Sequence, residues 1–305
     1  MLQKIVCFGE TLWDILPSGK LPGGAPMNVA INLRHNGFDP VVLSRVGNDD
    51  LGKELISFLE EQKINTEWIQ TGQTHLTGVV KANISDRNEV TYKIVEPVAW
   101  DYIQYEERIA RLISESDVFI YGSLVARSPL SQETLLQYLP LAKTKVFDVN
   151  LRPPHYTPER VLALLGLATI VKMNHQELEE ICGWLGSAGD FAQKMQAIKD
   201  QYELELVIVT RGDEGAAALT REGYFEHEGF QVEVEDTIGS GDAFLATFLT
   251  NYFQQKPLSE TLERACLIGA YVATQRGATP LYDPQEITPA SLTPSKQHSS
   301  LHPKS

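Results

Sequence analysis

The sequence is poor in cysteine, in long apolar runs and in positive charge. Its three cysteines, Cys7, Cys182 and Cys266, stand far apart, which excludes a disulfide framework and a Cys-x-x-Cys metal site. No segment approaches the roughly 18 consecutive apolar residues that a membrane-spanning helix needs. The apolar run at 5–8 is too short for a signal peptide. We therefore expect a cytoplasmic protein without a membrane partner.

The charge balance is acidic, with a formal net charge of −14 over 305 residues. Nucleic-acid-binding surfaces usually need clustered Lys and Arg, and no such cluster occurs here, so nucleic acid is not an expected partner. An acidic chain can still bind phosphates where amides, an arginine or a metal ion offset the repulsion.

Common phosphate-binding and metal-binding motifs are missing as well. The sequence has no Gly-x-x-x-x-Gly-Lys-Ser/Thr and no Gly-x-Gly-x-x-Gly, which excludes a Walker loop and a dinucleotide fingerprint. It has no His-Glu-x-x-His, and its 7 histidines are scattered. Any phosphate site must be built in another way.

Short runs rich in Val and Ile alternate with longer stretches of helical period. Strands are predicted at 5–8, 41–46, 118–121, 145–149, 170–173 and 206–210. Helices are predicted at 25–36, 51–62, 131–141, 176–185, 191–202, 241–253 and 258–276. This alternation predicts a mostly parallel sheet covered on both faces, with ligands beyond the carboxyl ends of its strands.

Three further segments outside this alternation predict a second, small sheet. Residues 11–16, 77–83 and 89–95 have mixed polar and apolar faces, and the polar residues 85–88 are expected to form a turn between the last two.

We interpret segments 11–22 and 76–96 as a β lid over the ligand edge of the main sheet. Both belong to one predicted domain at 1–284. Residues 285–305, which have no apolar period, are expected to form a flexible tail.

The sharpest motif is Asp-Thr-Ile-Gly-Ser-Gly-Asp at 236–242, directly before an apolar helical run. Its glycines allow a tight turn and leave the amides of Gly239, Ser240 and Gly241 free to bind an anion at the helix start. Asp242 can take a proton from an alcohol that attacks a phosphoryl group. Taken alone, the motif is more simply an ordinary glycine-rich helix start with a solvated Asp242.

The motif resembles the Asp-Thr-x-Gly-Ala-Gly-Asp signature of the PfkB (ribokinase-like) carbohydrate kinases, with Ser240 in place of Ala. A second motif of that family, a Gly-Gly pair with Asn four residues later, matches Gly23, Gly24 and Asn28. The resemblance covers nearly the whole chain. It implies a three-layer α/β/α fold with a small β lid, and an ATP-dependent sugar kinase with Asp242 as catalytic base.

Within the family the chain is most similar to fructokinases, through residues 8–14, 22–26 and 147–154. This resemblance implies that Asp14 accepts hydrogen bonds from two sugar hydroxyls, although by itself it could be an exposed acid at a strand end.

The resemblance gives the other sugar-side residues a role as well. It implies that Gly23 and Gly24 let the backbone approach the sugar, and that Asn28 both donates to a sugar hydroxyl and accepts from one.

Polar residues after two predicted strands complete the expected site. Arg152 contacts phosphate oxygens or the substrate, or alternatively forms an ion pair with Asp148. Asn174 and Glu177 match the Asn-x-x-Glu element of the family, which implies that Glu177 holds Mg²⁺ through water. They also fit a helix cap, and the two roles are compatible.

Three small residues are assigned to the nucleotide by the resemblance alone. Thr210 and Gly212 match a Thr-x-Gly contact with the nucleotide, and Ala278 lies where relatives line the adenine pocket.

The predicted reaction transfers the γ-phosphoryl of ATP to a primary hydroxyl of a ketose, converting D-fructose to fructose 6-phosphate. Mg²⁺ and, by resemblance, K⁺ are the expected ions.

The alternative is another kinase of this family, for 2-keto-3-deoxygluconate, ribose or a nucleoside, because residues 92–101 lack the Arg and the Asn-Pro-Ser-Ala-Asp-like run usual in fructokinases. A third possibility is a non-catalytic protein that binds a sugar or a nucleotide. Such a protein would be expected to have lost Asp242 or the glycines, and both are intact here.

The apolar residues of the lid also predict a partner. Trp13, Ile84 and Ile94 are expected to divide between the sugar and a second copy of the chain, so that a homodimer forms through the lid.

Overall fold

The structure of the chain, a computed structural model, describes residues 3–16, 19–84 and 90–292. The strands are β1 (Ile5–Phe8), β2 (Leu12–Leu16), β3 (Gly19–Gly23), β4 (Val41–Gly47), β5 (Ile69–Gly72), β6 (Gly78–Ile84), β7 (Val90–Ile94), β8 (Val118–Gly122), β9 (Thr144–Asp148), β10 (Ile170–Asn174), β11 (Leu206–Thr210), β12 (Ala216–Thr220) and β13 (Gly223–His227). The α-helices are α1 (Ala25–His35), α2 (Asp50–Glu61), α3 (Glu107–Glu115), α4 (Pro129–Tyr138), α5 (Pro158–Leu165), α6 (His175–Leu185), α7 (Phe191–Gln201), α8 (Ser240–Phe253) and α9 (Leu258–Ala273). Every predicted strand and helix is present, with small shifts at its ends.

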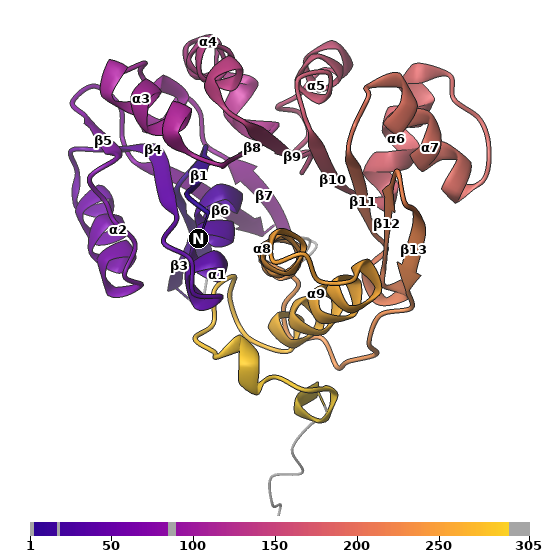
Figure 1. Cartoon of the computed structure of the whole chain (residues 1–305). Coiled ribbons are helices and arrows are strands. Elements are labelled where there is room, and N and C mark those ends of the chain that lie inside the picture. The colour runs from indigo at the N-terminus through magenta and orange to yellow at the C-terminus, as the bar shows by residue number, and fades with distance from the viewer. Residues whose placement is uncertain (1–2, 17–18, 85–89, 293–305) are drawn as a thin grey trace, which may run out of the picture.

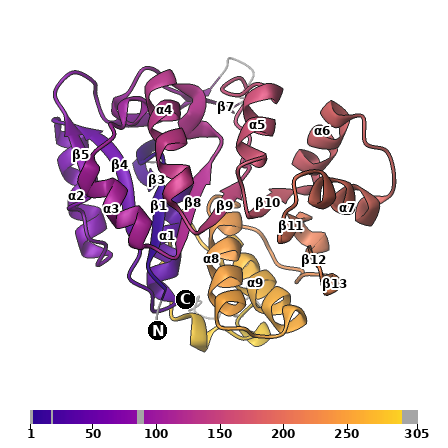
Figure 2. The same ribbon diagram turned by 45° about the horizontal axis from the view of Figure 1, so that its top comes forward.

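Within the described residues the central sheet has nine strands, in the order β13-β12-β11-β10-β9-β8-β1-β4-β5. The strands from β11 to β5 are parallel, and β12 and β13 add an antiparallel edge. Helices α3 to α7 lie on one face, and α1, α2, α8 and α9 lie on the other (Figures 1 and 2). The predicted three-layer α/β/α fold is confirmed.

Each face of the sheet has its own hydrophobic core, and successive residues of β1 alternate between the two. Val6 and Phe8 belong to the core under α3 to α7, whereas Ile5 and Cys7 belong to the core under α1 and α8. A strand that is covered on both sides must be apolar at every position, and this explains the uninterrupted apolar runs of the sequence.

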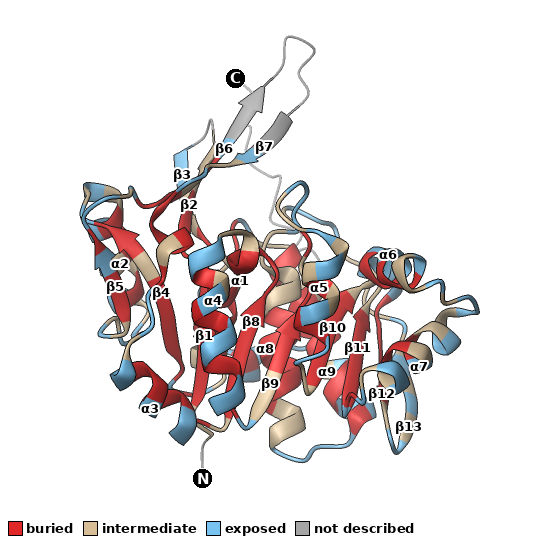
Figure 3. Ribbon diagram, turned by 90° about the horizontal axis from the view of Figure 1, so that it is seen from above, coloured by how far each residue is buried: buried red, intermediate tan, exposed pale blue. Residues whose placement is uncertain are grey.

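The second sheet has the order β3-β2-β6-β7 and projects from the main body (Figure 3). It corresponds to the predicted lid; the expected turn at 85–88 and the side chain of Ile84 lie outside the described residues. Trp13 of β2 is buried, and its Nε1 donates to the carbonyl of Leu51 at 2.9 Å. Trp13 therefore anchors the lid to α2, and its expected place at a sugar or dimer face is wrong.

Some described segments differ from the prediction. Helices α3 and α5 and strands β5, β12 and β13 lie where no element was predicted, and β3 overlaps the predicted lid segment 11–22, in which only the strand at 11–16 was expected. Residues 285–292, the expected start of a flexible tail, are packed: Ile287 and Leu292 are buried beside α9, and Arg264 donates to the Ile287 carbonyl at 2.6 Å. Burial of these two apolar side chains explains the packing. Residues 293–305 lie outside the described part of the chain.

Within the described residues, no helix is both long enough and apolar enough to span a membrane.

Candidate active site

A cavity of about 880 Å³ lies between the lid and the carboxyl ends of the central strands. Its wall includes residues from β2, β6 and β7 of the lid, from the loops after β1 and β9, and from the starts of α1 and α8. The predicted site residues in this wall are Asp14, Gly24, Asn28, Arg152, Asn174, Thr210, Gly239, Gly241 and Asp242. The fold therefore gathers most of the predicted residues around one cavity.

The start of α8 is shaped by Gly239, the N-cap residue, whose φ of 79° lies in the left-handed region. A Cβ at this position would overlap the carbonyl oxygen of Ala278, so only glycine fits. Among the described residues the amides of Gly239, Gly241 and Asp242 have no hydrogen-bond acceptor. These amides and the helix dipole form an anion-binding position at the cavity.

Ser240 departs from the expectation that its amide also faces the anion. Its amide donates to the carbonyl of Thr237 at 3.3 Å, which closes the turn before the helix. Its hydroxyl donates to the carbonyl of Gly269 at 2.9 Å and ties α8 to α9. Ser240 therefore supports the turn, because the tight bend directs its amide back into the loop.

Asp242 is held in place by Asn28, whose Nδ2 donates to Oδ2 at 2.8 Å. Burial raises the pKa of Asp242 to about 6; the charge of Asp148 adds to this, and Lys172, the Asn28 hydrogen bond and Arg152 oppose it. Asn28 donates one of its two side-chain N–H groups to Asp242, so its other N–H and its Oδ1 are left for a ligand. This oxygen is buried and has no partner in the described part of the chain.

The carboxylate of Asp14 faces the cavity from β2, and burial raises its pKa to about 6, opposed by the charge of Arg152. Gly23 is absent from the cavity wall, but a Cβ there would overlap Oδ2 of Asp14, so this glycine leaves room for the carboxylate. Gly24 has a φ of 117° and packs against the carbonyl of Glu10, where no side chain would fit.

Glu10 lines the same wall and was missed by the sequence analysis. It is 3% exposed; Oε1 accepts from the amide of Ala25 at 3.2 Å, and Oε2 is buried without a partner among the described residues. Burial raises the pKa of Glu10 to about 7. The available signal was an acid directly after a buried strand, on the expected ligand edge.

Arg152 does not form the ion pair with Asp148 that the sequence left open. Asp148 instead accepts from Nζ of Lys172 at 3.0 Å, directly across the β9–β10 pairing. Arg152 is exposed, lines the cavity and donates to the carbonyl of its neighbour Leu151 at 3.1 Å. Its guanidinium remains available to a ligand.

Asn174 and Glu177 form the capping box of α6, as the sequence allowed. The Glu177 amide donates to Oδ1 of Asn174, and the Asn174 amide donates to Oε2 of Glu177, both at 2.8 Å. Oε1 of Glu177 accepts from the Leu151 amide at 2.7 Å, so this buried acid also fixes the loop after β9. Its role as a Mg²⁺ ligand stays a prediction; no group of three or more His, Cys, Asp or Glu side chains is arranged for a metal in the described ranges.

The three residues that the resemblance assigned to the nucleotide occupy different positions. Thr210 ends β11 and lines the cavity, whereas Gly212, with a φ of 63°, and Ala278 are not part of the wall. Ala278 is buried against Gly239, so it acts on the site by supporting the turn before α8.

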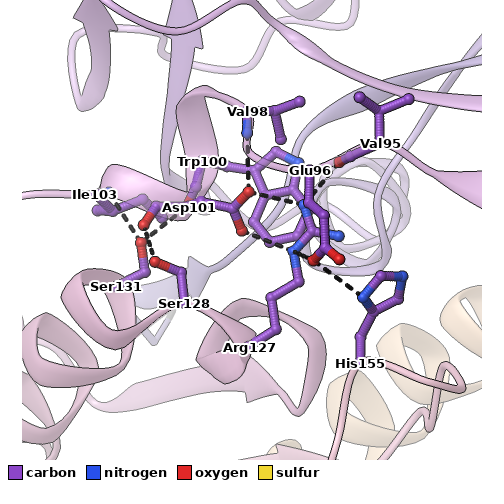
Figure 4. A network of polar contacts seen from close by, with 10 residues as sticks. All are labelled: Val95, Glu96, Val98, Trp100, Asp101, Ile103, Arg127, Ser128, Ser131 and His155. Carbon is purple, nitrogen blue, oxygen red and sulfur yellow. Dashed lines mark hydrogen bonds and ion pairs between the residues drawn. The ribbon is translucent and has the colours of Figure 1, made fainter.

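The lid is joined to the main domain through a buried arginine (Figure 4). Nε and Nη2 of Arg127 contact the two carboxylate oxygens of Asp101 at 2.7 and 2.8 Å, and Nη2 also donates to the carbonyl of Val95 at 2.8 Å. The guanidinium lies 3.9 Å from the ring centroid of Trp100. Val95 directly follows β7, so this network fixes the end of the lid.

A more exposed pair lies beside this network, at the cavity. Nδ1 of His155 is 3.3 Å from Oε2 of Glu96, and the Glu96 carboxylate is 3.8 Å from Nε of Arg127. Both Glu96 and His155 line the cavity, and they connect the lid end to the loop after β9 (Figure 4). Glu96 belongs to the segment 92–101, in which the sequence departs from the fructokinase pattern.

Residues 3–285 match the family model described as pfkB family carbohydrate kinase. The chain is 26% identical to a fructokinase of Salmonella typhimurium over 297 residues, covering 91% of this chain and 95% of that protein. It is 28% identical to fructokinase-1 of Oryza sativa subsp. japonica, covering 91% and 94%. A crystal structure of a Xylella fastidiosa fructokinase with bound ATP matches with a TM-score of 0.81 and 25% identity, over 92% of this chain and 94% of that one.

Proposed function

The chain belongs to the pfkB family of carbohydrate kinases, and we propose that it transfers the γ-phosphoryl of ATP to a primary hydroxyl of D-fructose. One observation carries the proposal: Asp242 stands at the start of α8 beside amides that have no acceptor among the described residues, in the same cavity as Asp14. A base, an anion-binding position and a hydroxyl-binding carboxylate are what phosphoryl transfer to a sugar requires.

On the sugar side, Asp14 accepts from two hydroxyls, and Asn28 accepts from a hydroxyl through its free Oδ1. Gly24 lets the sugar approach the backbone at the start of α1. The proposed orientation directs one primary hydroxyl toward Asp242, which takes its proton as the oxygen attacks the γ-phosphorus.

On the phosphate side, the amides of Gly239, Gly241 and Asp242 donate to the phosphoryl oxygens, on which negative charge accumulates in the transition state. Arg152 reaches the same space from the loop after β9. Mg²⁺, when bound with ATP, reduces the charge of the phosphates. Asn174 and Glu177 are proposed to hold the ion through water, because each Glu177 oxygen accepts one amide and keeps a second lone pair.

A second candidate is a kinase of the same family with a different sugar or nucleoside. Glu96 in the cavity wall favours it, because Glu96 stands in the segment 92–101 that departs from fructokinases and contacts His155 across the cavity wall. The assignment of fructose as substrate can therefore be wrong while the assignment of phosphoryl transfer is right.

A coupled assay of ADP release across fructose, ribose, 2-keto-3-deoxygluconate and nucleosides tests the function. We expect fructose to give the largest kcat/KM. A larger value for another acceptor would replace the substrate, and absence of sugar-dependent ADP release would overturn the kinase itself.

The proposal includes the setting of the enzyme. All three cysteines are free and buried, which suits a reducing cytoplasm. The resemblance also implies that the enzyme binds K⁺. Comparing the rate of phosphorylation in KCl with that in NaCl tests this. A homodimer through the lid predicts twice the chain mass in light scattering at micromolar concentration.

A further inference from the structure

A buried lysine under the start of α8 has no part in the mechanism so far. Lys172 is 7% exposed, yet it lines the cavity, whereas Lys93 and Arg152 in the same wall are exposed. A buried ammonium is costly unless it is paired, and here the partner is Asp148, itself 3% exposed.

The register of the sheet directs Lys172 toward α8. Ile170, two residues earlier on β10, belongs to the core under α1 and α8, and side chains two apart share a face of a strand. A Cβ placed on Gly241 would lie 3.3 Å from Nζ of Lys172. The ammonium is thus next to the backbone whose free amides form the anion-binding position.

The ammonium also has unused donors. A lysine carries three N–H groups, and within the described residues its side chain makes one hydrogen bond, to Oδ1 of Asp148. Oδ2 of Asp148 is buried and has no partner there. Nζ of Lys172 and Oδ1 of Asp148 form a buried ion pair at 3.0 Å, which holds the ammonium in one place.

We propose that the Lys172 ammonium, oriented by Asp148, contacts the transferring phosphoryl group, an assignment that rests on the kinase function proposed above. As the bond from the γ-phosphorus to the ADP oxygen breaks and the bond to the sugar oxygen forms, the hydroxyl proton goes to Asp242. Lys172 keeps its proton and neutralises the phosphoryl oxygens. An acidic cavity needs such a fixed cation where a phosphate must pass.

The same geometry predicts how the Lys172–Asp148 pair affects the base. Asp242 is faced by charged and polar groups from the elements around it: Glu10, Asn28, Asp148, Arg152 and Lys172. Lys172→Met removes a positive charge, so the pKa of Asp242 rises and the acid limb of kcat/KM moves to higher pH. Asp148→Asn removes a negative charge, so this limb moves to lower pH.

The decisive variant combines Lys172→Met with Asp148→Asn. It leaves no unpaired buried charge, so it should fold even where the single variants do not, and the two shifts of the acid limb should cancel. The ammonium is still lost, so kcat should fall by about 10²–10³. Affinity for a non-hydrolysable ATP analogue should fall, while affinity for ADP, which lacks the transferred group, should be unchanged.

Lys53→Met, on the exposed surface of α2, is the matched control and should change none of these values. The proposal is overturned if the double variant keeps the wild-type kcat, or loses affinity for ADP and the ATP analogue equally, as a merely structural pair would. Failure of the wild-type chain to phosphorylate any sugar would instead sink the proposed function. The comparison of ADP with the ATP analogue would still decide on Lys172.

Discussion

The two walls of the cavity differ in how their charged side chains are held. In the main-domain wall, Glu10 and Lys172 are buried and bonded to the Ala25 amide and to Asp148. Among the charged side chains that the described residues place in this wall, only Arg152 is exposed. In the lid wall, Lys93 is exposed and the Glu96 side chain is 57% exposed. Fixed charges suit a reaction that depends on positioning, whereas exposed ones can be exchanged without disturbing the core. The difference suggests that the main domain carries the chemistry and the lid selects and encloses the sugar.

The largest effect expected from breaking this division is at Asp242. Asp242→Asn keeps the shape and can still accept from Asn28, but it cannot take the proton, so kcat should fall by about 10²–10⁴. Calorimetry should show unchanged fructose affinity. A variant with more than a tenth of wild-type kcat, when chemistry limits the rate, would remove Asp242 from this role.

The base of the lid should be as rigid as the main domain. Arg127→Met leaves the buried Asp101 carboxylate without its cationic partner, with only the Val98 amide still donating to it, and should lower the free energy of unfolding by about 3–5 kcal/mol. Arg108→Met is the control, since Arg108 also contacts a tryptophan, Trp68, but its side chain is 50% exposed. Its cost should stay within about 1 kcal/mol in urea unfolding. Equal costs for the two variants would contradict a rigid lid base.

Sugar binding should be separable from ATP binding at Asp14. Asp14→Ala removes charged hydrogen bonds to two hydroxyls and should raise the fructose KM by roughly 10–100-fold. The KM for ATP should change little, and Asp39→Ala on the surface should change neither. Unaltered fructose affinity in the Asp14 variant would refute its assignment.

Glu10 should make stability depend on pH. Its pKa is raised by burial from 4.5 to about 7, so the folded chain binds more protons than the unfolded chain between these values. The contribution of Glu10 to stability therefore falls as pH rises through this window.

Glu10→Gln should accordingly unfold at nearly the wild-type temperature at pH 5 and at a higher temperature at pH 8. At pH 8 the free energy of unfolding of Glu10→Gln should exceed that of the wild type by at most about 3 kcal/mol. Glu61→Gln, at the exposed end of α2, should show no such pH dependence. A pH-independent difference for Glu10→Gln would show that burial does not perturb this carboxyl group.

The smallest expected effect is the change in hydrogen exchange that accompanies closure of the lid. With fructose and a non-hydrolysable ATP analogue, β2, β6 and β7 should gain protection in hydrogen exchange relative to the free chain. No added protection on these strands would refute closure, whatever the oligomeric state.

The sequence predicted the regular core because its strands are apolar at every position and its helices are amphipathic. It missed β12, since Ala216, Ala217 and Ala218 are poor strand formers by propensity and pairing with β11 overrides this. Helix α5 could have been found, because Thr157 caps it and Pro158 is its first residue.

Site residues that lie together in a sequence motif were predictable. Residues that become partners only through the pairing of two strands were harder to predict. The glycines and Asp242 are adjacent in sequence, and so they were recognised together. Asp148 and Lys172 come from different strands, and only the sheet register shows them to be partners. A signal existed, since a lysine inside the apolar run of β10 is seldom buried without a partner.

Identification of the product tests the central claim most directly. After incubation with ATP and fructose, coupled ³¹P–¹H NMR should show one phosphomonoester attached to a CH₂ group, in amounts equal to the ADP released. Inorganic phosphate in place of a sugar phosphate, or a phosphoryl group on a secondary carbon, would contradict the proposed orientation of a primary hydroxyl toward Asp242.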